Sequence, residues 1–153
     1  MEYIKSDKSG ECIFCDLRPE LDRDHLVLHR VQHVFVLLNR YPYSAGHLLV
    51  APYAHGACLE ELEFEVRSDL MARIADGARV LKHAYRCDGL NIGANVGTAS
   101  GAGYPDHLHF HIVPRWSGDT NFMTVVGETS VIPQHVERIF DELVAGFQEL
   151  SAS

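Results

Sequence analysis

The sequence predicts one α+β domain in which an antiparallel sheet packs against a long helix. Three observations lead to this prediction: short runs rich in β-branched and aromatic residues in the first third of the chain, a long amphipathic stretch over residues 59–85, and alternation of histidine with apolar residues over residues 107–112. A chain of 153 residues is long enough to bury one sizeable core. We therefore expect residues 1–153 to form a single domain, with residues 1–10 as a flexible arm and residues 133–150 as a C-terminal helix.

The composition argues against several broad classes of function. The formal net charge of −8 opposes general affinity for nucleic acid, because binding to phosphate backbones needs a basic face. No apolar run is long enough to span a bilayer, and the N-terminus lacks a signal-peptide pattern. We therefore expect no membrane partner and a cytoplasmic location. An anionic substrate would need a locally positive pocket, which histidines together with Arg40 or Arg115 could supply.

The first half of the chain predicts three strands and a helix. Apolar runs at residues 26–29 and 34–38 indicate two strands joined by a turn, and residues 46–52 indicate a third. From residue 59 to residue 85, apolar side chains recur at three- and four-residue spacing, and acidic residues crowd the start of this stretch. We expect a helix over residues 59–85, with Asp88-Gly89 as the signal that stops it. Its apolar stripe, a core or dimer contact, comprises Val66, Leu70, Ile74, Ala78, Leu81 and Tyr85.

The second half predicts two further strands, a glycine-rich loop and a last helix. Residues 90–95 alternate weakly and indicate a strand, and residues 122–126 could form a short one. Residues 97–103 are rich in glycine and small side chains, so their backbone N–H groups could approach an anion closely. This loop lacks the lysine and the spacing of a nucleotide P-loop. Pro133 is a favoured first residue for the last helix.

A row of histidines is the most informative feature of the chain. On a strand, His107, His109 and His111 share one face, whereas the apolar residues between them share the other. A strand needs no such row for stability, because each partly buried imidazole requires hydrogen-bond partners. A metal site and a satisfied polar face are the simpler explanations for such a row.

Cys12 and Cys15 form a C-x-x-C pair near the N-terminus. In a reducing compartment such a pair is more often a metal clip or a redox motif than a disulfide. A zinc site would need two further ligands. A thioredoxin-like motif normally opens a helix after a strand, and here only a polar segment precedes it. Free thiols are the third possibility.

The histidine row, together with Asn39, the Gly46-His47 pair and the C-x-x-C pair, resembles the histidine triad (HIT) superfamily. The segment after Trp116 resembles bacterial members of its fragile histidine triad branch that cleave diadenosine polyphosphates. The resemblance extends from about Cys12 to Phe122 and implies two-fold dimers that join their sheets. It also implies a structural zinc ion, and the residues that match the family's ligands are Cys12, Cys15, His55 and His107.

The resemblance assigns roles to further residues. The middle histidine of the family's triad is the nucleophile, which here is His109, with His111 and His47 contacting the phosphates. Four further residues are expected to contact the nucleotide: Asn39, Asn95, Gly103 and Trp116. Asn39 could instead be a turn asparagine bonded to its own backbone, and Trp116 could instead be a core residue. Fragile-type relatives often place glutamine or serine where this chain has Ala102 and Gly103.

These residues suggest a reaction at phosphorus. A neutral imidazole is nucleophilic near neutral pH without a separate base, and a covalent intermediate divides one displacement into two easier steps. We therefore expect an enzyme that cleaves a dinucleoside polyphosphate, such as diadenosine tetraphosphate, or a related nucleotide at the α-phosphate through a nucleotidyl-histidine. Transfer to water would make it a hydrolase, and transfer to inorganic phosphate a phosphorylase. The alternatives are a nucleoside phosphoramidase, a non-catalytic nucleotide-binding protein, and a metalloenzyme that uses the histidine row as ligands.

Overall fold

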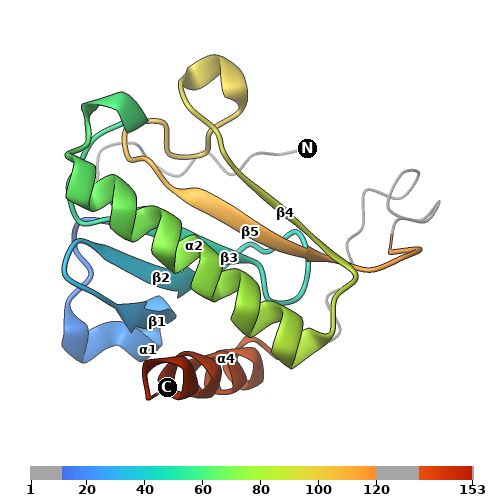
Figure 1. Cartoon of the computed structure of the whole chain (residues 1–153). Coiled ribbons are helices and arrows are strands. Elements are labelled where there is room, and N and C mark those ends of the chain that lie inside the picture. The colour runs from blue at the N-terminus through green and yellow to red at the C-terminus, as the bar shows by residue number, and fades with distance from the viewer. Residues whose placement is uncertain (1–11, 120–134, 153) are drawn as a thin grey trace.

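The apolar, β-branched runs of the sequence pair into a five-stranded antiparallel sheet (Figure 1). The computed structural model describes residues 12–119 and 135–152. The strand order is β1-β2-β3-β5-β4, so β1 and β4 form the two edges. The strands are β1 (Val27–Arg30), β2 (Val34–Leu38), β3 (Leu48–Pro52), β4 (Gly89–Ala94) and β5 (Phe110–Arg115). The predicted α+β fold with an antiparallel sheet is confirmed, and β5 begins at Phe110 rather than at the first histidine of the row.

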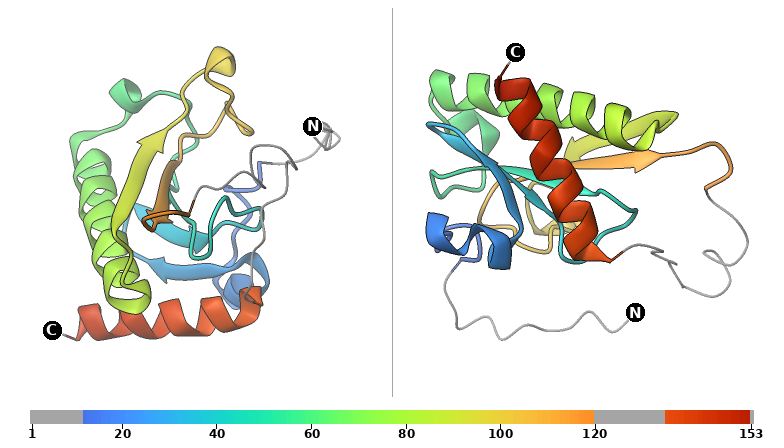
Figure 2. Two further views of the ribbon diagram at one scale, coloured as in Figure 1. Left: turned by 90° about the vertical axis from the view of Figure 1, so that its right-hand side faces the viewer. Right: turned by 90° about the horizontal axis from the view of Figure 1, so that it is seen from below.

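One long helix, α2 (Phe64–Tyr85), covers a single face of the sheet (Figure 2). The prediction that this helix begins at residue 59 is wrong. Leu59–Glu61 form a separate 3-10 turn, η2, and Leu62 and Glu63 then have extended backbones. The predicted end at Tyr85 is confirmed, because Arg86 adopts the left-handed conformation and its N–H bonds to the carbonyl of Lys82.

The second long helix, α4 (Val136–Ser151), packs against both α2 and β1 (Figure 2). It buries one apolar stripe, as the sequence predicts. That stripe comprises Ile139, Phe140, Leu143 and Phe147. The predicted start at Pro133, the short strand at residues 122–126 and the arm at residues 1–10 lie outside the described residues. Among the described residues, no helix combines the length and apolarity that crossing a membrane requires.

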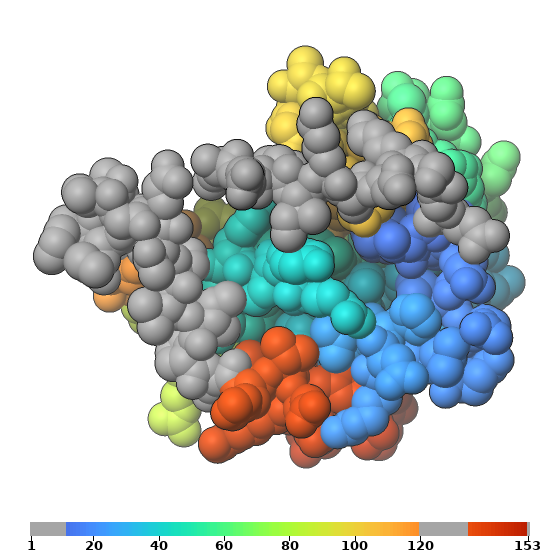
Figure 3. Space-filling model, turned by 180° about the vertical axis from the view of Figure 1, so that it is seen from behind, coloured from blue at the N-terminus to red at the C-terminus, as the bar shows by residue number. Residues whose placement is uncertain are grey.

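The two faces of the sheet have separate cores. The larger core lies under α2 and α4 and takes alternate side chains of β2, β3 and β5, such as Val36, Leu48 and Ile112. The opposite face carries a smaller cluster formed by Phe14, Val27, Phe35, Leu37, Leu49 and Ala51. Because side chains alternate along a strand, residues of β5 next to Ile112 must point to this second face. Figure 3 views the molecule from that side, away from α2.

Three short helices complete the described elements. Pro19–Leu21 (η1) and Asp22–His25 (α1) precede β1, and Thr98–Ser100 (η3) lies in the loop between β4 and β5. In that loop Gly97 and Gly101 have φ values of 78° and 81°, which only glycine adopts without strain.

Candidate active site and metal-binding cluster

The histidine row lies at the start of β5, on the face of the sheet that α2 leaves uncovered. His111 pairs in register with Leu49 of β3, and both side chains point away from the larger core. His107 and His109 precede the strand, and Leu108 between them is buried in the larger core. His47, which is fully buried, lies directly before Leu48 at the start of β3. The antiparallel pairing of β3 and β5 therefore brings His47 and His111 together.

A chain of hydrogen bonds fixes the protonation of His47 and His111. The backbone N–H of Tyr43 donates to His47 Nδ1 at 3.1 Å, so the ring proton of neutral His47 is on Nε2. His47 Nε2 lies 2.9 Å from His111 Nδ1 and donates to it. The proton of neutral His111 is therefore on its own Nε2, which remains a donor for a substrate oxygen.

His109 has the opposite tautomer. Its Nδ1 lies 2.9 Å from the backbone carbonyl oxygen of His107, and because a carbonyl only accepts, Nδ1 carries the proton. Nε2 of His109 then has a free lone pair. The ring centroids of His109 and His111 are 5.0 Å apart, and the side chain of His109 is only 6% exposed. The site thus places an imidazole with a free lone pair beside an imidazole donor.

Burial keeps these imidazoles uncharged. It lowers the pKa of His47 to about 3 and that of His111 to about 4, with a further contribution from the neighbouring imidazoles. Burial also lowers the pKa of His109, against the bond to the His107 carbonyl, which raises it. All three rings are therefore neutral at pH 7. Neutral imidazoles can act as a nucleophile or as hydrogen-bond donors, but they do not supply the locally positive pocket that was expected for an anionic substrate.

The two arginines considered as sources of positive charge have other partners. Arg40 donates to the backbone carbonyl of Asp24, and Arg115 bonds to Asp119 and to the Asn91 side chain. The first bond ties the segment after β2 to α1, and the second pair of bonds ties the turn after β5 to β4 and β5.

Asn39 supports the histidine pair directly. Its Nδ2 lies 3.2 Å from His47 Nδ1, and its Oδ1 accepts the backbone N–H of Tyr41 at 3.0 Å. The second bond is the local asparagine turn that the sequence left open as an alternative. The same side chain therefore shapes the turn before β3 and contacts His47.

The other three nucleotide-contact candidates lie on segments around β4 and β5. Asn95 and Gly103 are exposed, the former directly after β4 and the latter in the glycine-rich loop. No heavy atom lies within 4 Å of the position that a Cβ on Gly103 would take, so the space beside it is open. Trp116 is half-buried beyond β5, where its Nε1 donates to the Tyr85 carbonyl at the end of α2.

Four side chains form a possible metal site beside the histidines. The ligand atoms of Cys12, Cys15, His55 and His107 all lie within 4.8 Å of one another. Cys12 Sγ is 3.2 Å from His107 Nδ1, and Cys15 Sγ is 3.2 Å from His55 Nδ1. A tetrahedral zinc ion with two sulfur and two nitrogen ligands would separate these atoms by about 3.3–3.8 Å. The donor set and its spacing therefore fit zinc.

Two further hydrogen bonds hold the residues of this cluster in position. His107 Nε2 donates to the carbonyl of Pro52 at 2.9 Å, which leaves Nδ1 unprotonated and directed at the thiols. This is the second-sphere bond that commonly orients a metal-ligating histidine. The backbone N–H of Leu108 bonds to the Gly56 carbonyl at 2.7 Å and so joins the segments that carry His107 and His55.

Two aromatic residues at the site were not predicted from the sequence. The Tyr43 ring lies 4.8 Å from the His47 ring and 6.1 Å from that of His111. Phe14, between the two cysteines, packs against both His107 and His109. The position of Phe14 inside the C-x-x-C pair, after a polar N-terminal segment, is the signal that could have identified it.

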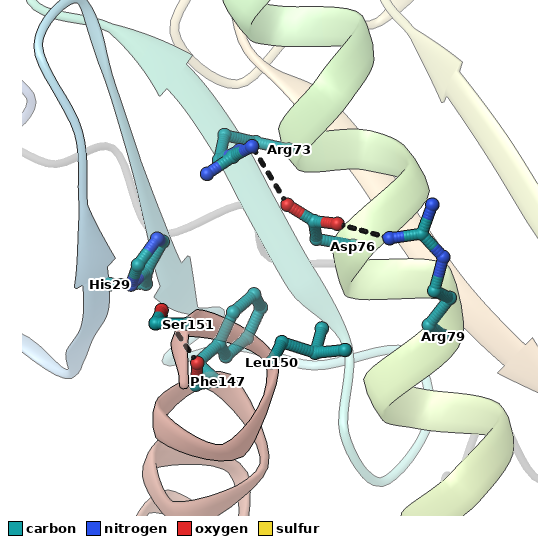
Figure 4. Close-up of a pocket in the computed structure, with 7 residues that line it drawn as sticks. All are labelled: His29, Arg73, Asp76, Arg79, Phe147, Leu150 and Ser151. Atoms are coloured by element: carbon teal, nitrogen blue, oxygen red, sulfur yellow. Dashed lines mark hydrogen bonds and ion pairs between the residues drawn. The ribbon is translucent and has the colours of Figure 1, made fainter. Parts of the chain in front are cut away.

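A separate cavity of about 220 Å³ lies on the helical side of the molecule, between α2, α4 and β1 (Figure 4). Asp76 bonds to both arginines of this cavity, Arg73 at 2.9 Å and Arg79 at 2.5 Å. His29 is half-buried and stacks on Phe147 with 5.3 Å between the ring centroids. This cavity and the histidine row lie on opposite faces of the sheet.

Comparison with known proteins agrees with this geometry. The HIT domain family model matches residues 20–118. An AP-4-A phosphorylase from Mycobacterium tuberculosis is 45% identical over 117 residues, which cover 76% of this chain and 60% of that protein. An adenosine 5'-monophosphoramidase from Saccharomyces cerevisiae is 31% identical over 105 residues, which cover 68% of this chain and 62% of that protein. The chain thus spans about three fifths of the length of these curated relatives.

A solved structure shows the same fold. A Zn-bound histidine triad family protein from Mycobacterium smegmatis aligns with a TM-score of 0.72, and the alignment covers 93% of this chain and 96% of that one. The two sequences are 24% identical, so this likeness shows the fold alone.

Proposed function

Because the chain belongs to the HIT domain family, we propose that it cleaves a dinucleoside polyphosphate, such as diadenosine tetraphosphate, through a nucleotidyl-histidine formed on His109. The observation that carries this proposal is the tautomer of His109. Its Nδ1–H is bonded to the His107 carbonyl, so the neutral ring has an unprotonated Nε2. The identity to a relative named AP-4-A phosphorylase supports the substrate class.

The first step is an in-line displacement at the α-phosphorus. The lone pair of His109 Nε2 forms the N–P bond, and the P–O bond to the departing nucleoside polyphosphate breaks with its electron pair. His111 Nε2–H donates to an oxygen of the transferring or leaving group and offsets its developing charge. His47 holds His111 in this tautomer through the 2.9 Å bond between them.

The second step returns His109 to its free state. Water or inorganic phosphate attacks the phosphorus, and the N–P bond breaks with its electron pair returning to Nε2. Attack by water yields a nucleoside monophosphate, whereas attack by phosphate yields a nucleoside diphosphate. We propose phosphate as the acceptor, because the relative with 45% identity is named a phosphorylase.

We propose Asn39, Asn95, Gly103 and Trp116 as nucleotide contacts. The exposure of Asn95 and Gly103 on segments that flank the histidine row supports this role. The contact of Asn39 with His47 supports a position beside the transferred nucleotide. The Nε1–H bond of Trp116 to the Tyr85 carbonyl is made in the plane of the indole, so a ring face could stack on a base.

We propose that the four-residue cluster binds zinc and that this zinc is structural. Two cysteines and two histidines would supply four protein ligands, which fill a tetrahedral site and leave no open position for substrate. When bound, zinc would tie the N-terminal segment to the loop after β3 and to the start of the histidine row. Among the described residues, only His107 of the row joins this cluster, which favours a structural role over a catalytic metal.

We further propose one domain, a cytoplasmic location and a homodimer. The free edge of the sheet supports the dimer, because β4 leaves Asn91, Ile92 and Gly93 exposed along it. Joining two such edges would continue the sheet across a two-fold axis. Reduced thiols in a metal cluster suit a reducing compartment.

A nucleoside phosphoramidase is the second candidate. The same first step would expel an amine in place of a phosphate, and a relative named adenosine 5'-monophosphoramidase supports it. Assay of the protein on diadenosine tetraphosphate and on adenosine 5'-phosphoramidate in parallel compares the two activities directly.

Intact-protein mass spectrometry tests the proposed mechanism. The protein is incubated with labelled diadenosine tetraphosphate, with and without inorganic phosphate, and an adduct of one adenylate is expected. His109→Asn should abolish both the adduct and the product. His33→Asn is the matched control, a half-buried histidine between β1 and β2 that should keep both. Near-normal product formation by His109→Asn would refute the mechanism, and binding of AMP without turnover of any adenylate by the wild type would indicate a non-catalytic binding protein.

A further inference from the structure

Phe14 links the possible metal site to the proposed nucleophile. Phe14 lies between the two cysteines, directly before Cys15, and is only 2% exposed. Its ring centroid lies 4.9 Å from that of His109 and 5.1 Å from that of His107. The aromatic side chain between the two thiols therefore packs against the imidazole that would attack phosphorus.

A second link runs through the backbone of His107. The ring of His107 directs Nδ1 at the thiols and donates from Nε2 to the Pro52 carbonyl. The backbone carbonyl oxygen of His107 accepts the Nδ1–H of His109. Two of the contacts that orient the His109 ring, the hydrogen bond and the packing of Phe14, thus come from residues within the metal cluster or between its ligands. The His111 ring of β5 lies on another side of His109, with 5.0 Å between the ring centroids.

From these contacts we infer that Phe14 is a positioning residue for the proposed reaction. The Cys12–Cys15 turn, which zinc would anchor, holds the Phe14 ring against one side of His109, so that the imidazole keeps the rotamer in which Nδ1–H meets the His107 carbonyl. Without that ring, His109 has room to rotate about its Cβ–Cγ bond, which would put Cδ2 in the place of Nδ1 and Cε1 in the place of Nε2 and so break the bond to the His107 carbonyl. This inference rests on the proposed function for its kinetic consequence, and its structural consequence can be read without substrate.

Phe35 provides a matched control. It is fully buried in the same apolar cluster, 6.4 Å from Phe14 between ring centroids, and its other ring partner is Tyr53. Within the described part of the chain, no ring contact joins Phe35 to a histidine. Phe14→Leu and Phe35→Leu therefore remove equal side-chain volume from one cluster, and only the first removes a contact with His109.

The experiment compares both variants with the wild type as zinc-loaded proteins. Zinc content and melting temperature are measured first, followed by the long-range ¹H–¹⁵N spectrum of the histidine rings, which distinguishes the Nδ1–H from the Nε2–H tautomer. The rate of adenylate adduct formation and KM are then measured with diadenosine tetraphosphate. Should Phe14→Leu not fold, Phe14→Met, which keeps an unbranched apolar side chain, takes its place.

The expected result separates the two variants. Phe14→Leu keeps its zinc and gives averaged or shifted His109 ring signals, and its adduct forms about ten to a hundred times more slowly with little change in KM. Phe35→Leu loses comparable stability but keeps the wild-type His109 signals and an adduct rate within about twofold.

Two results would overturn the inference. One is a His109 spectrum of Phe14→Leu identical to that of the wild type. The other is an adduct rate for Phe14→Leu equal to that of Phe35→Leu. If the wild type itself forms no adduct, the proposed function fails, while the ring spectra still decide whether Phe14 positions His109.

Discussion

Replacement of Gly46 by alanine tests how the end of α2 supports His47. Gly46 directly precedes His47 and has a φ of +79°. A Cβ at this position would lie 2.8 Å from Tyr85 Cε2 and 3.1 Å from Leu81 Cδ2, which are both side-chain atoms of the last turns of α2. The helix therefore approaches the start of β3 too closely for any side chain at residue 46.

The expected cost has two parts. A non-glycine residue in the left-handed region costs about 1–2 kcal/mol. Overpacking against the Tyr85 ring adds about 1–2 kcal/mol, because the close contact must be relieved by a shift of Tyr85, α2 or β3. The free energy of unfolding should therefore fall by about 2–4 kcal/mol, which for a chain of this length lowers Tm by about 4–16 °C.

Urea denaturation and thermal melting measure this change. Gly89→Ala is the control, because Gly89 has an ordinary φ and no heavy atom within 4 Å of its would-be Cβ. It should alter the free energy of unfolding by no more than about 0.5 kcal/mol. If Gly46→Ala is as stable as Gly89→Ala, the close approach of α2 to residue 46 does not constrain the start of β3, and the reasoning is wrong.

Three further predictions follow from the site and the cavity. The folded-state pKa values of His47 and His111, about 3 and 4, lie below the ordinary 6.5, so the unfolded chain binds more protons below pH 6.5. Urea unfolding between pH 4.5 and 7.5 should therefore show that the free energy of unfolding decreases as the pH falls below about 6.5. The expected slope is up to about 1.4 kcal/mol per pH unit for each histidine. A free energy of unfolding that does not change over this range would contradict the burial of these rings. Cys12→Ser should lose the bound zinc and lower Tm, whereas unchanged metal content in elemental analysis would refute the four-residue site. Asp76→Asn should destabilise the protein by about 1–2 kcal/mol, because it removes the bridging charge between two arginines. Arg79→Ala should destabilise it by less than about 1 kcal/mol, since Arg79 is mostly exposed. Both should leave turnover unchanged, and a rate loss of tenfold or more in either would connect this cavity to the reaction.

The local sequence pattern was enough to predict the described strands and to identify the residues of the histidine row. β2 alternates between two apolar faces and the row alternates histidine with apolar residues, and this period of two survives in the structure because each strand has two distinct faces. The helix boundaries were less predictable. Leu59 and Leu62 fit the apolar spacing of the helix, but Leu59–Glu61 form a 3-10 turn and Leu62 and Glu63 are extended, so α2 begins only at Phe64.

By itself, the sequence determined which residue types the site contains: three alternating histidines, a histidine after glycine, and a pair of cysteines. Only the tertiary structure decided how those groups are protonated and supported. The Nδ1–H of His109, the relay from Tyr43 through His47 to His111, and the packing of Phe14 all depend on carbonyls, amides and rings from distant segments. Tautomer and ring orientation are set by hydrogen-bond partners, and a linear sequence does not state which partners the fold brings within 3 Å.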